Sequence, residues 1–179
     1  MKKARIGTLA AVTVVGIAVA LTGCANSGAA SSSSKSLTIG TTDKITTIDP
    51  AGSYDNGSYA VETQVYPFLM NTKPGSSKAV PDIATSAKFT SAKTYTVKLK
   101  KGLTFANGHK LTSSDVKFSF DRVLKINNAN GPASLLSNLD RTTTNGPLTV
   151  VFHLKSANDQ TFPQVLTSPA GPIVDEQSF

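Results

Sequence analysis

The sequence predicts a mixed α/β fold of the α+β kind, because two strand patterns flank one amphipathic helix pattern. Residues 95–100 alternate between apolar and polar side chains, from Tyr95 to Lys100, which is the period of a strand with one wet face. The same alternation returns in residues 148–154, after the chain-breaking Asn145-Gly146-Pro147. Each strand therefore presents one face to a core and one to water.

The helix pattern lies between these two strands. Asn107-Gly108 predicts a turn, since both residues tolerate positive φ. Thr112, followed three residues later by Asp115, predicts a capped helix start, and the carboxylate also favours the helix N-terminus. One apolar helical stripe follows at spacings of three and four residues, formed by Val116, Phe120, Val123 and Leu124.

The run from Tyr95 to Leu124 also resembles a known family. The family's order is an alternating strand, a Lys-Gly pair, an aromatic residue, an Asp/Asn-Gly turn and a Leu-Thr-x-x-Asp-Val helix start. In this sequence the elements after the strand correspond, in the same order, to Lys101-Gly102, Phe105, Asn107-Gly108 and residues 111–116. This run is similar to the family 5 extracellular solute-binding proteins, the lipoprotein receptors of peptide and nickel ABC importers.

The resemblance implies a partial type II periplasmic-binding-protein fold. It would contain the first strand of lobe I and most of the additional N-terminal subdomain of the family. Residues 37–42 correspond to the opening strand, with Leu37, Ile39 and Thr41 alternating, and Ile48-Asp49-Pro50 corresponds to a Leu-Asp-Pro turn. In that turn, proline fixes φ and Asp49 can accept hydrogen bonds from nearby backbone N–H groups.

Other elements follow the family in order. Residues 59–70 are expected to form a helix that Pro67 ends or bends, running into a short strand. Its expected core positions are Val61, Val65 and Phe68. Phe89 takes the place of a tryptophan that is usual in the family, because the chain has none, and Phe162-Pro163 corresponds to a helix start.

The N-terminus predicts an extracytoplasmic lipoprotein. Residues 1–23 read as a signal peptide, with basic residues at positions 2, 3 and 5 and an apolar stretch from Ile6 to Leu21. Leu21-Thr22-Gly23-Cys24 looks like a bacterial lipobox, in which Gly23 permits cleavage and the Cys24 thiol accepts a diacylglyceryl group. A buried small hydrophobe or a free thiol is the other interpretation of this lone cysteine.

Residues 24–36 are rich in serine, alanine and glycine and are expected to tether the folded residues 37–179 to the lipid surface. The chain after residue 23 has 15 basic and 11 acidic residues, with the lysines mostly scattered. A nucleic-acid-binding protein is expected to carry a basic stripe with interleaved aromatic residues, and the sequence contains no such stripe.

No catalytic constellation, metal site or cofactor motif is predicted, so the chain is expected not to be an enzyme. The two histidines, His109 in a turn and His153 on the polar face of a strand, have no cysteine or carboxylate at metal-ligand spacing. Paired carboxylates and glycine-rich phosphate loops are also missing from the sequence. Solute binding without catalysis fits this composition.

The resemblance implies a solute bound between two lobes that close by hinge motion, followed by recognition of the closed form by the permease subunits. Thr42, Asp43, Lys44 and Ile45 align with a ligand-facing stretch of the peptide-binding relatives. Asp43 would pair with a peptide α-amino group, whereas Lys44 stands where some relatives have an acidic residue. The alternative is that both are solvated loop residues.

Relatives in this family are about three times as long, so the chain is expected to be an N-terminal part of that architecture. Its opening strand would then lack partners and expose an apolar edge that invites aggregation. Two functions remain open. The first is a peptide receptor lipoprotein of an ABC importer, and the second is a surface lipoprotein without a transport role that uses the partial fold for interaction or signalling.

Overall fold

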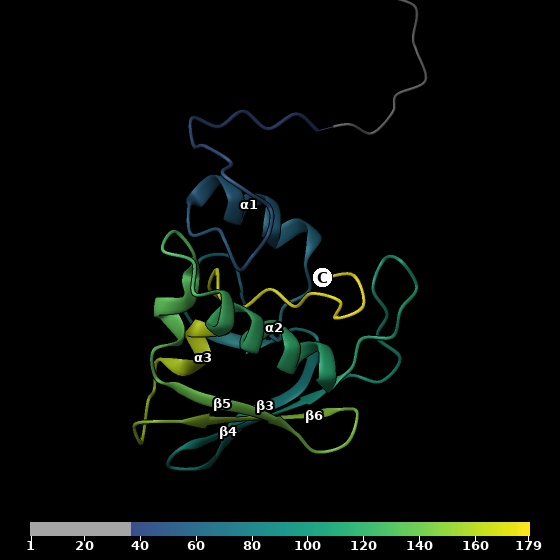
Figure 1. The fold of residues 1–179 in the computed structure, drawn as a ribbon, viewed down its shortest axis with the longest axis vertical. Coiled ribbons are helices and arrows are strands. Elements are labelled where there is room, and N and C mark those ends of the chain that lie inside the picture. The colour runs from purple at the N-terminus through teal and green to yellow at the C-terminus, as the bar shows by residue number, and fades with distance from the viewer. Residues whose placement is uncertain (1–36) are drawn as a thin grey trace, which may run out of the picture. The chain divides into compact units, whose positions relative to one another are not determined.

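A four-stranded antiparallel sheet organises the described part of this computed structural model, residues 37–179. The strands lie in the order β3-β4-β6-β5 (Figure 1). Their bounds are Ala84–Ser91 for β3, Thr94–Leu99 for β4, Leu139–Thr144 for β5 and Thr149–Leu154 for β6. Two hairpins, β3-β4 and β5-β6, meet through the β4-β6 pair, in which Val97 lies opposite Val150.

The alternating strand patterns are confirmed. The apolar residues of β4 and β6 are buried except for Val151, and the residues between them are exposed or half-buried. Apart from Val151, each of these two strands therefore sends its apolar side chains to one face of the sheet and its polar side chains to the other.

Helix α2, Ser113–Ile126, packs its apolar stripe against the buried face of the sheet. The capping box is confirmed, because the Thr112 side chain accepts from the Ser114 N–H while Asp115 Oδ2 accepts from the Thr112 N–H at 2.8 Å. Val116, Phe120 and Val123 are buried, and Leu124 is half-buried.

Aromatic side chains fill the space between helix and sheet. The rings of Phe120 and Phe152 meet edge-to-face with centroids 4.9 Å apart, and Phe162 lies 5.4 Å from Phe152 and 5.6 Å from Tyr95. This geometry suits the quadrupoles of the rings as well as burying their area. Phe162 begins the short helix α3, Phe162–Val165, so α3 lies on the same side of the sheet as α2.

The remaining elements complete the unit formed by residues 40–179. Helix α1 is Asn56–Val65, and β1, Met70–Thr72, pairs with β2, Ala79–Pro81. A 3-10 helix, η1, spans Pro132–Leu136. The chain returns near its end, where Pro172 bridges Phe68 and the Ile173 N–H donates to the Pro67 carbonyl at 2.9 Å.

Two local expectations are wrong. Residues 37–42 form no strand, and Leu37 and Ile39 are 84% and 78% exposed. A strand is stabilised by a hydrogen-bonded neighbour, and no strand within residues 37–179 pairs with this segment. Val65 is 60% exposed, because Tyr66 and Pro67 end α1 there and Ser58 and Glu62 face the interior instead.

The predicted signal peptide, the Gly23-Cys24 cleavage and lipidation site, and the tether of residues 24–36 lie outside the described residues. They stay predictions.

Because Phe152 touches both Phe120 and Phe162, Phe152→Ala is expected to lower the free energy of unfolding by about 3–5 kcal/mol. Urea denaturation of the purified chain measures this loss. The control is Val151→Ala, one residue earlier on the other face of β6, which is expected to cost about 1 kcal/mol or less. Equal losses in the two variants would contradict the two-faced sheet.

Candidate ligand-facing site

Thr42, Asp43 and Lys44 lie exposed on the surface, followed by Ile45, which is 53% exposed. A local turn shapes the start of this segment, because the Asp43 N–H donates to the Thr41 hydroxyl at 3.0 Å. The four residues predicted to face the ligand are therefore contiguous and accessible. Their role in binding stays a prediction.

The segment is held against the first turn of α1. The Thr46 N–H donates to Ser58 Oγ at 3.0 Å, and the Thr46 hydroxyl donates to Asp55 Oδ2 at 2.5 Å. Asp55 is also the N-cap of α1, since its Oδ1 accepts from the Ser58 N–H at 2.8 Å. These hydrogen bonds lower the pKa of Asp55 below its usual value, and the bond from the Thr46 side chain has the largest effect.

Gly57 lets the two segments approach closely. A Cβ atom at this position would lie 2.1 Å from the Lys44 carbonyl oxygen, so no larger residue fits without moving the backbone. The main chain at Lys44 and Ile45 thus lies directly against α1, while the side chain of Lys44 is exposed.

A polar hollow of about 560 Å³ adjoins this segment. It is lined by Thr46-Thr47, by Gly52, Tyr54 and Asp55, and by the loop of residues 128–130, so none of residues 42–45 lines it. Its walls offer hydroxyl, amide and backbone groups together with the Asp55 carboxylate, all of which can form hydrogen bonds to peptide-like groups.

A two-pronged ion pair joins this region to α2. Arg122 donates to Asp49 Oδ1 at 2.6 Å and to Oδ2 at 2.8 Å, the geometry in which arginine binds carboxylates best. The arginine bonds lower the pKa of Asp49, although partial burial opposes them. Asp49 also accepts from the Ala51 N–H at 3.0 Å, as expected for its turn.

A buried acid lies beneath the same loop. Glu62 of α1 is 1% exposed, and the Ser53 hydroxyl donates to its Oε1. Its Oε2 has no hydrogen-bond partner among the described residues. Burial raises the pKa of Glu62, the Ser53 bond opposes this, and the negative charges of Asp55 and Asp49 raise it further.

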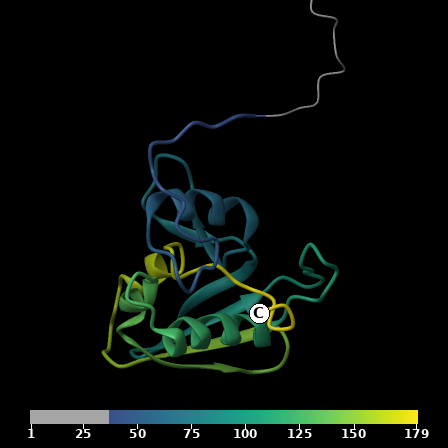
Figure 2. The same ribbon diagram turned by 45° about the horizontal axis from the view of Figure 1, so that its top comes forward.

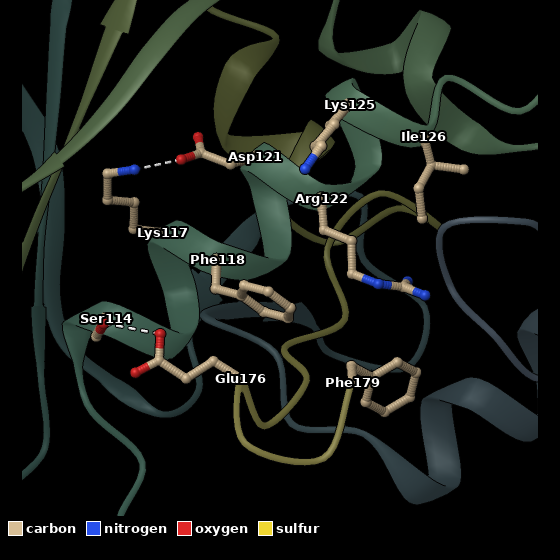
Figure 3. A pocket seen from close by; sticks show the side chains of 9 residues that line it. All are labelled: Ser114, Lys117, Phe118, Asp121, Arg122, Lys125, Ile126, Glu176 and Phe179. Atoms are coloured by element: carbon tan, nitrogen blue, oxygen red, sulfur yellow. Dashed lines mark hydrogen bonds and ion pairs between the residues drawn. The ribbon is translucent and has the colours of Figure 1, made fainter.

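A second hollow, of about 650 Å³, runs along the outer side of α2 (Figure 3). Phe118 and Phe179 give it apolar walls, and the Arg122 guanidinium lies 4.9 Å from the centre of the Phe179 ring. At one end, Ser114 donates to Glu176 at 2.9 Å. None of the four predicted ligand-facing residues lines this hollow.

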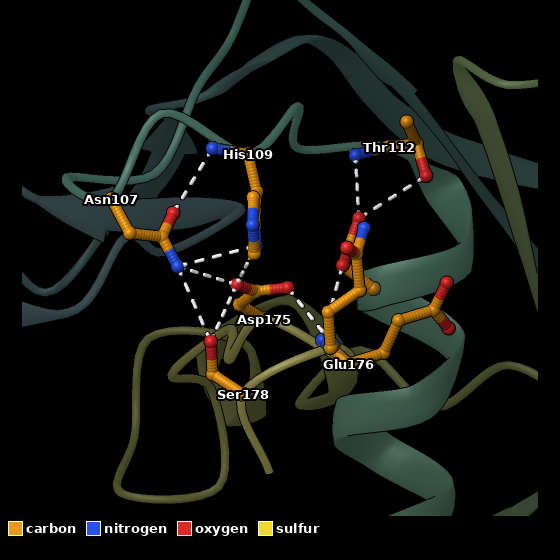
Figure 4. Close-up of polar contacts among 8 residues, drawn as sticks. Asn107, His109, Thr112, Asp175, Glu176 and Ser178 are labelled. Carbon is orange, nitrogen blue, oxygen red and sulfur yellow. Dashed lines mark hydrogen bonds and ion pairs between the residues drawn. The ribbon is translucent and has the colours of Figure 1, made fainter.

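The structure gives His109 a carboxylate partner that the sequence did not indicate. Its Nδ1 lies 2.6 Å from Asp175 Oδ2, which also accepts from Asn107 at 2.7 Å and Ser178 at 2.8 Å (Figure 4). Burial would raise the pKa of Asp175, but the hydrogen bonds from Asn107, the Gln177 N–H, Ser178 and His109 together lower it. The cluster fastens the chain after Val174 to the Asn107-Gly108 turn.

The segment after Ile173 also makes polar contacts with α2. Asp115 Oδ1 accepts from the Glu176 N–H at 3.2 Å, and the Val174 N–H donates to Ser119 Oγ at 2.9 Å. His153 lies apart, where its Nε2 is 2.9 Å from the Thr143 hydroxyl.

Among residues 37–179, no group of three or more potential ligand residues could hold a metal ion. In the same range, no helix has the length and apolar character needed to cross a membrane.

The fold and the sequence place this chain in a family. The sequence model of the bacterial extracellular solute-binding proteins, family 5 Middle, matches residues 78–179. The chain belongs to this family, which confirms the resemblance of the Tyr95–Leu124 run.

Two curated relatives are peptide-binding proteins by name. The probable D,D-dipeptide-binding periplasmic protein DdpA of Escherichia coli K12 is 37% identical over 102 residues, covering 54% of this chain and 19% of the relative. The oligopeptide-binding protein AppA of Bacillus subtilis is 24% identical over 180 residues, covering 95% of this chain and 33% of AppA. The chain thus spans a fifth to a third of the length of these relatives.

Solved structures share the fold. AppA in complex with a nonapeptide matches with a TM-score of 0.63 and 25% identity, over 72% of this chain and 25% of AppA. A periplasmic oligopeptide-binding protein of Thermotoga maritima with bound mannohexaose matches with a TM-score of 0.56 and 27% identity, over 64% and 21% of the two chains. Together with the other matched periplasmic binding proteins, they confirm that this chain forms part of a type II periplasmic-binding-protein fold.

Because the folded pKa of Glu62 lies above its unfolded value, its contribution to stability is complete below about pH 4.3 and is lost as the pH rises through the folded pKa. Glu62→Gln removes this ionisation. The melting temperature of the variant is expected to exceed that of the parent at pH 7 and to approach it near pH 4.

The matched control is Glu176→Gln, the same substitution at an exposed glutamate. The difference in melting temperature between this variant and the parent is expected to be the same at pH 4 and at pH 7. A Glu62→Gln advantage that grew toward acid pH would have the wrong sign and would contradict the burial of an ionisable carboxyl.

Proposed function

We propose that this chain is the N-terminal part of the substrate-binding lipoprotein of an ABC importer, which captures oligopeptides or dipeptides outside the membrane and delivers them to the permease. The observation that carries this proposal is family 5 membership together with 37% identity to a relative named for dipeptide binding. The proposed activity is binding without catalysis.

The ligand-facing part of the proposal rests on residues 42–45. Their side chains are exposed and their main chain approaches α1 closely at Gly57, while Thr46, the next residue, is hydrogen-bonded to Ser58 and lines the polar hollow. A binding site gains affinity when its backbone is ordered before the ligand arrives, because less entropy is lost on binding. Asp43 is the residue proposed to pair with a peptide α-amino group.

Partners on the membrane side follow from the same proposal. The closed, ligand-bound receptor would meet the ABC permease subunits. A lipid on Cys24 would hold the protein on the extracytoplasmic face of the cell membrane, after removal of residues 1–23.

If Cys24 carries the lipid, cells fed an alkyne-labelled palmitate are expected to incorporate the label into this protein, and Cys24→Ser is expected to lose it completely. Gel fluorescence of the immunoprecipitated protein measures the incorporation. Ser27→Ala, three residues later, is the control and is expected to keep the label. Labelling that survived Cys24→Ser would reject lipidation at this residue.

If Asp43 pairs with the peptide terminus, Asp43→Asn is expected to weaken binding of a peptide with a free α-amino group about tenfold, since the ion pair is replaced by a weaker hydrogen bond to a neutral amide oxygen. N-acetylation of the same peptide is expected to remove the difference between parent and variant. Isothermal titration calorimetry on the full-length gene product measures both affinities.

The control for that titration is Asp82→Asn, a partly exposed acid beside β2, which is expected to leave both affinities unchanged. An unaltered affinity in Asp43→Asn would show that Asp43 does not bind the peptide terminus and is a solvated loop residue. Tight binding of mannohexaose with no peptide binding would replace peptides by oligosaccharides as the solute.

A further inference from the structure

Charge is divided unevenly within residues 37–179. The sheet and its hairpin turns, residues 84–101 and 139–155, contain seven lysine and arginine residues and one acidic residue, Asp140. The other described residues contain seven basic and ten acidic residues. Asp140 is itself paired with Arg141 at 2.6 Å. The sheet is therefore strongly basic, while the rest of the unit is slightly acidic.

The basic side chains of the strands, Lys88, Lys98 and Arg141, lie on the face of the sheet that α2 and α3 leave open, which we call the polar sheet face. Figures 1 and 2 show α2 and α3 on the opposite face of the sheet. On that face, Phe120 of α2 and Phe162 of α3 contact Phe152 of β6. The register pairs Lys88 with Thr96, Lys98 with Ser86, and Arg141 with His153 on the polar sheet face. Its one apolar side chain within the four strands is Val151.

A hollow at one end of the polar sheet face strengthens the basic character. It has a volume of about 400 Å³ and is lined by Lys93, Arg141, His153 and Lys155, with Asp140 as its single acid. Lys155 is fixed there, since its Nζ donates to the Ser137 carbonyl at 2.7 Å. Because Arg141 is paired with Asp140, Lys93 and Lys155 supply the net positive charge around this hollow, which suits a phosphate group.

We infer that the polar sheet face docks on an anionic membrane surface, with phospholipid phosphates as its ligands. This inference rests on the lipid anchor proposed for Cys24. Fifteen residues lie between Cys24 and Gly40, and the sixteen Cα–Cα steps span at most about 55 Å when the chain is fully extended. Confinement to that distance corresponds to an effective concentration on the order of millimolar, so even weak electrostatic binding populates the docked state.

The composition of the face favours a lipid surface over a protein partner. Protein interfaces have an apolar core enriched in aromatic residues and depleted in lysine. The polar sheet face instead offers lysine, arginine and threonine around one valine. Scattered lysines on a sheet attract a diffuse layer of negative charge without needing a complementary shape, and salt screens this attraction.

The test is co-sedimentation of the chain from Cys24 to Phe179, without lipid and with its thiol alkylated, with vesicles. Binding is expected to vesicles of phosphatidylglycerol and phosphatidylcholine, but not to pure phosphatidylcholine, and 0.5 M salt is expected to abolish it. Lys88→Thr with Lys98→Thr is expected to weaken the partition about 25-fold, at about fivefold for each lysine.

The matched control is Lys73→Thr with Lys78→Thr, which removes the same charge from the exposed loop between β1 and β2. It is expected to bind as the parent does, and circular dichroism checks that both variants fold. Equal losses in the two pairs, or no binding to the anionic vesicles, would overturn the inference. Tighter binding to soluble polyglutamate than to vesicles would also overturn it, in favour of an acidic protein partner.

The outcome is independent of solute binding, because the experiment contains no peptide and no permease. Absence of docking would therefore leave the transport proposal standing, and absence of peptide binding would leave the docking result standing.

Discussion

The packing of α2 on the sheet is the constraint on which the rest of the unit depends. Its inner side places Phe120 against Phe152 and closes the core. The same helix reaches two other parts of the chain through polar side chains. Arg122 binds Asp49 in the loop before α1, and Asp115 and Ser119 bind the backbone of Glu176 and Val174. One helix thus fixes the core, the approach to the candidate site and the final segment.

Elements whose signal is local were predictable from the sequence. The alternation around Val97 and the Thr112–Asp115 capping box involve residues that lie within a few positions of each other. The start of α1 was not predicted: Asp55 is the N-cap of this helix, whereas the helix was expected to begin at Tyr59.

Contacts between distant residues were not predictable in this way. Arg122 and Asp49 are 73 positions apart, and His109 and Asp175 are 66 positions apart. Neither pair has a spacing that a local pattern could reveal, because the fold alone brings the partners together. The strand predicted for residues 37–42 is absent for a related reason. Leu37 and Ile39 alternate like the residues of a strand, but strand formation also needs a hydrogen-bonded partner. The family resemblance identified the fold because it summarises these long-range contacts.

Shared fold does not determine the ligand, since relatives of this architecture hold a nonapeptide in one case and mannohexaose in another. Within this chain, however, the proposed functions occupy separate surfaces. The loop that leads into α1 lies on the helix-covered side of the sheet in both views, so docking through the polar sheet face would leave residues 42–45 turned away from the bilayer and open to solute (Figures 1 and 2). Delivery to a permease would then require the protein to leave the docked state. Attraction that depends on a few lysines and is screened by salt is weak enough to permit that release.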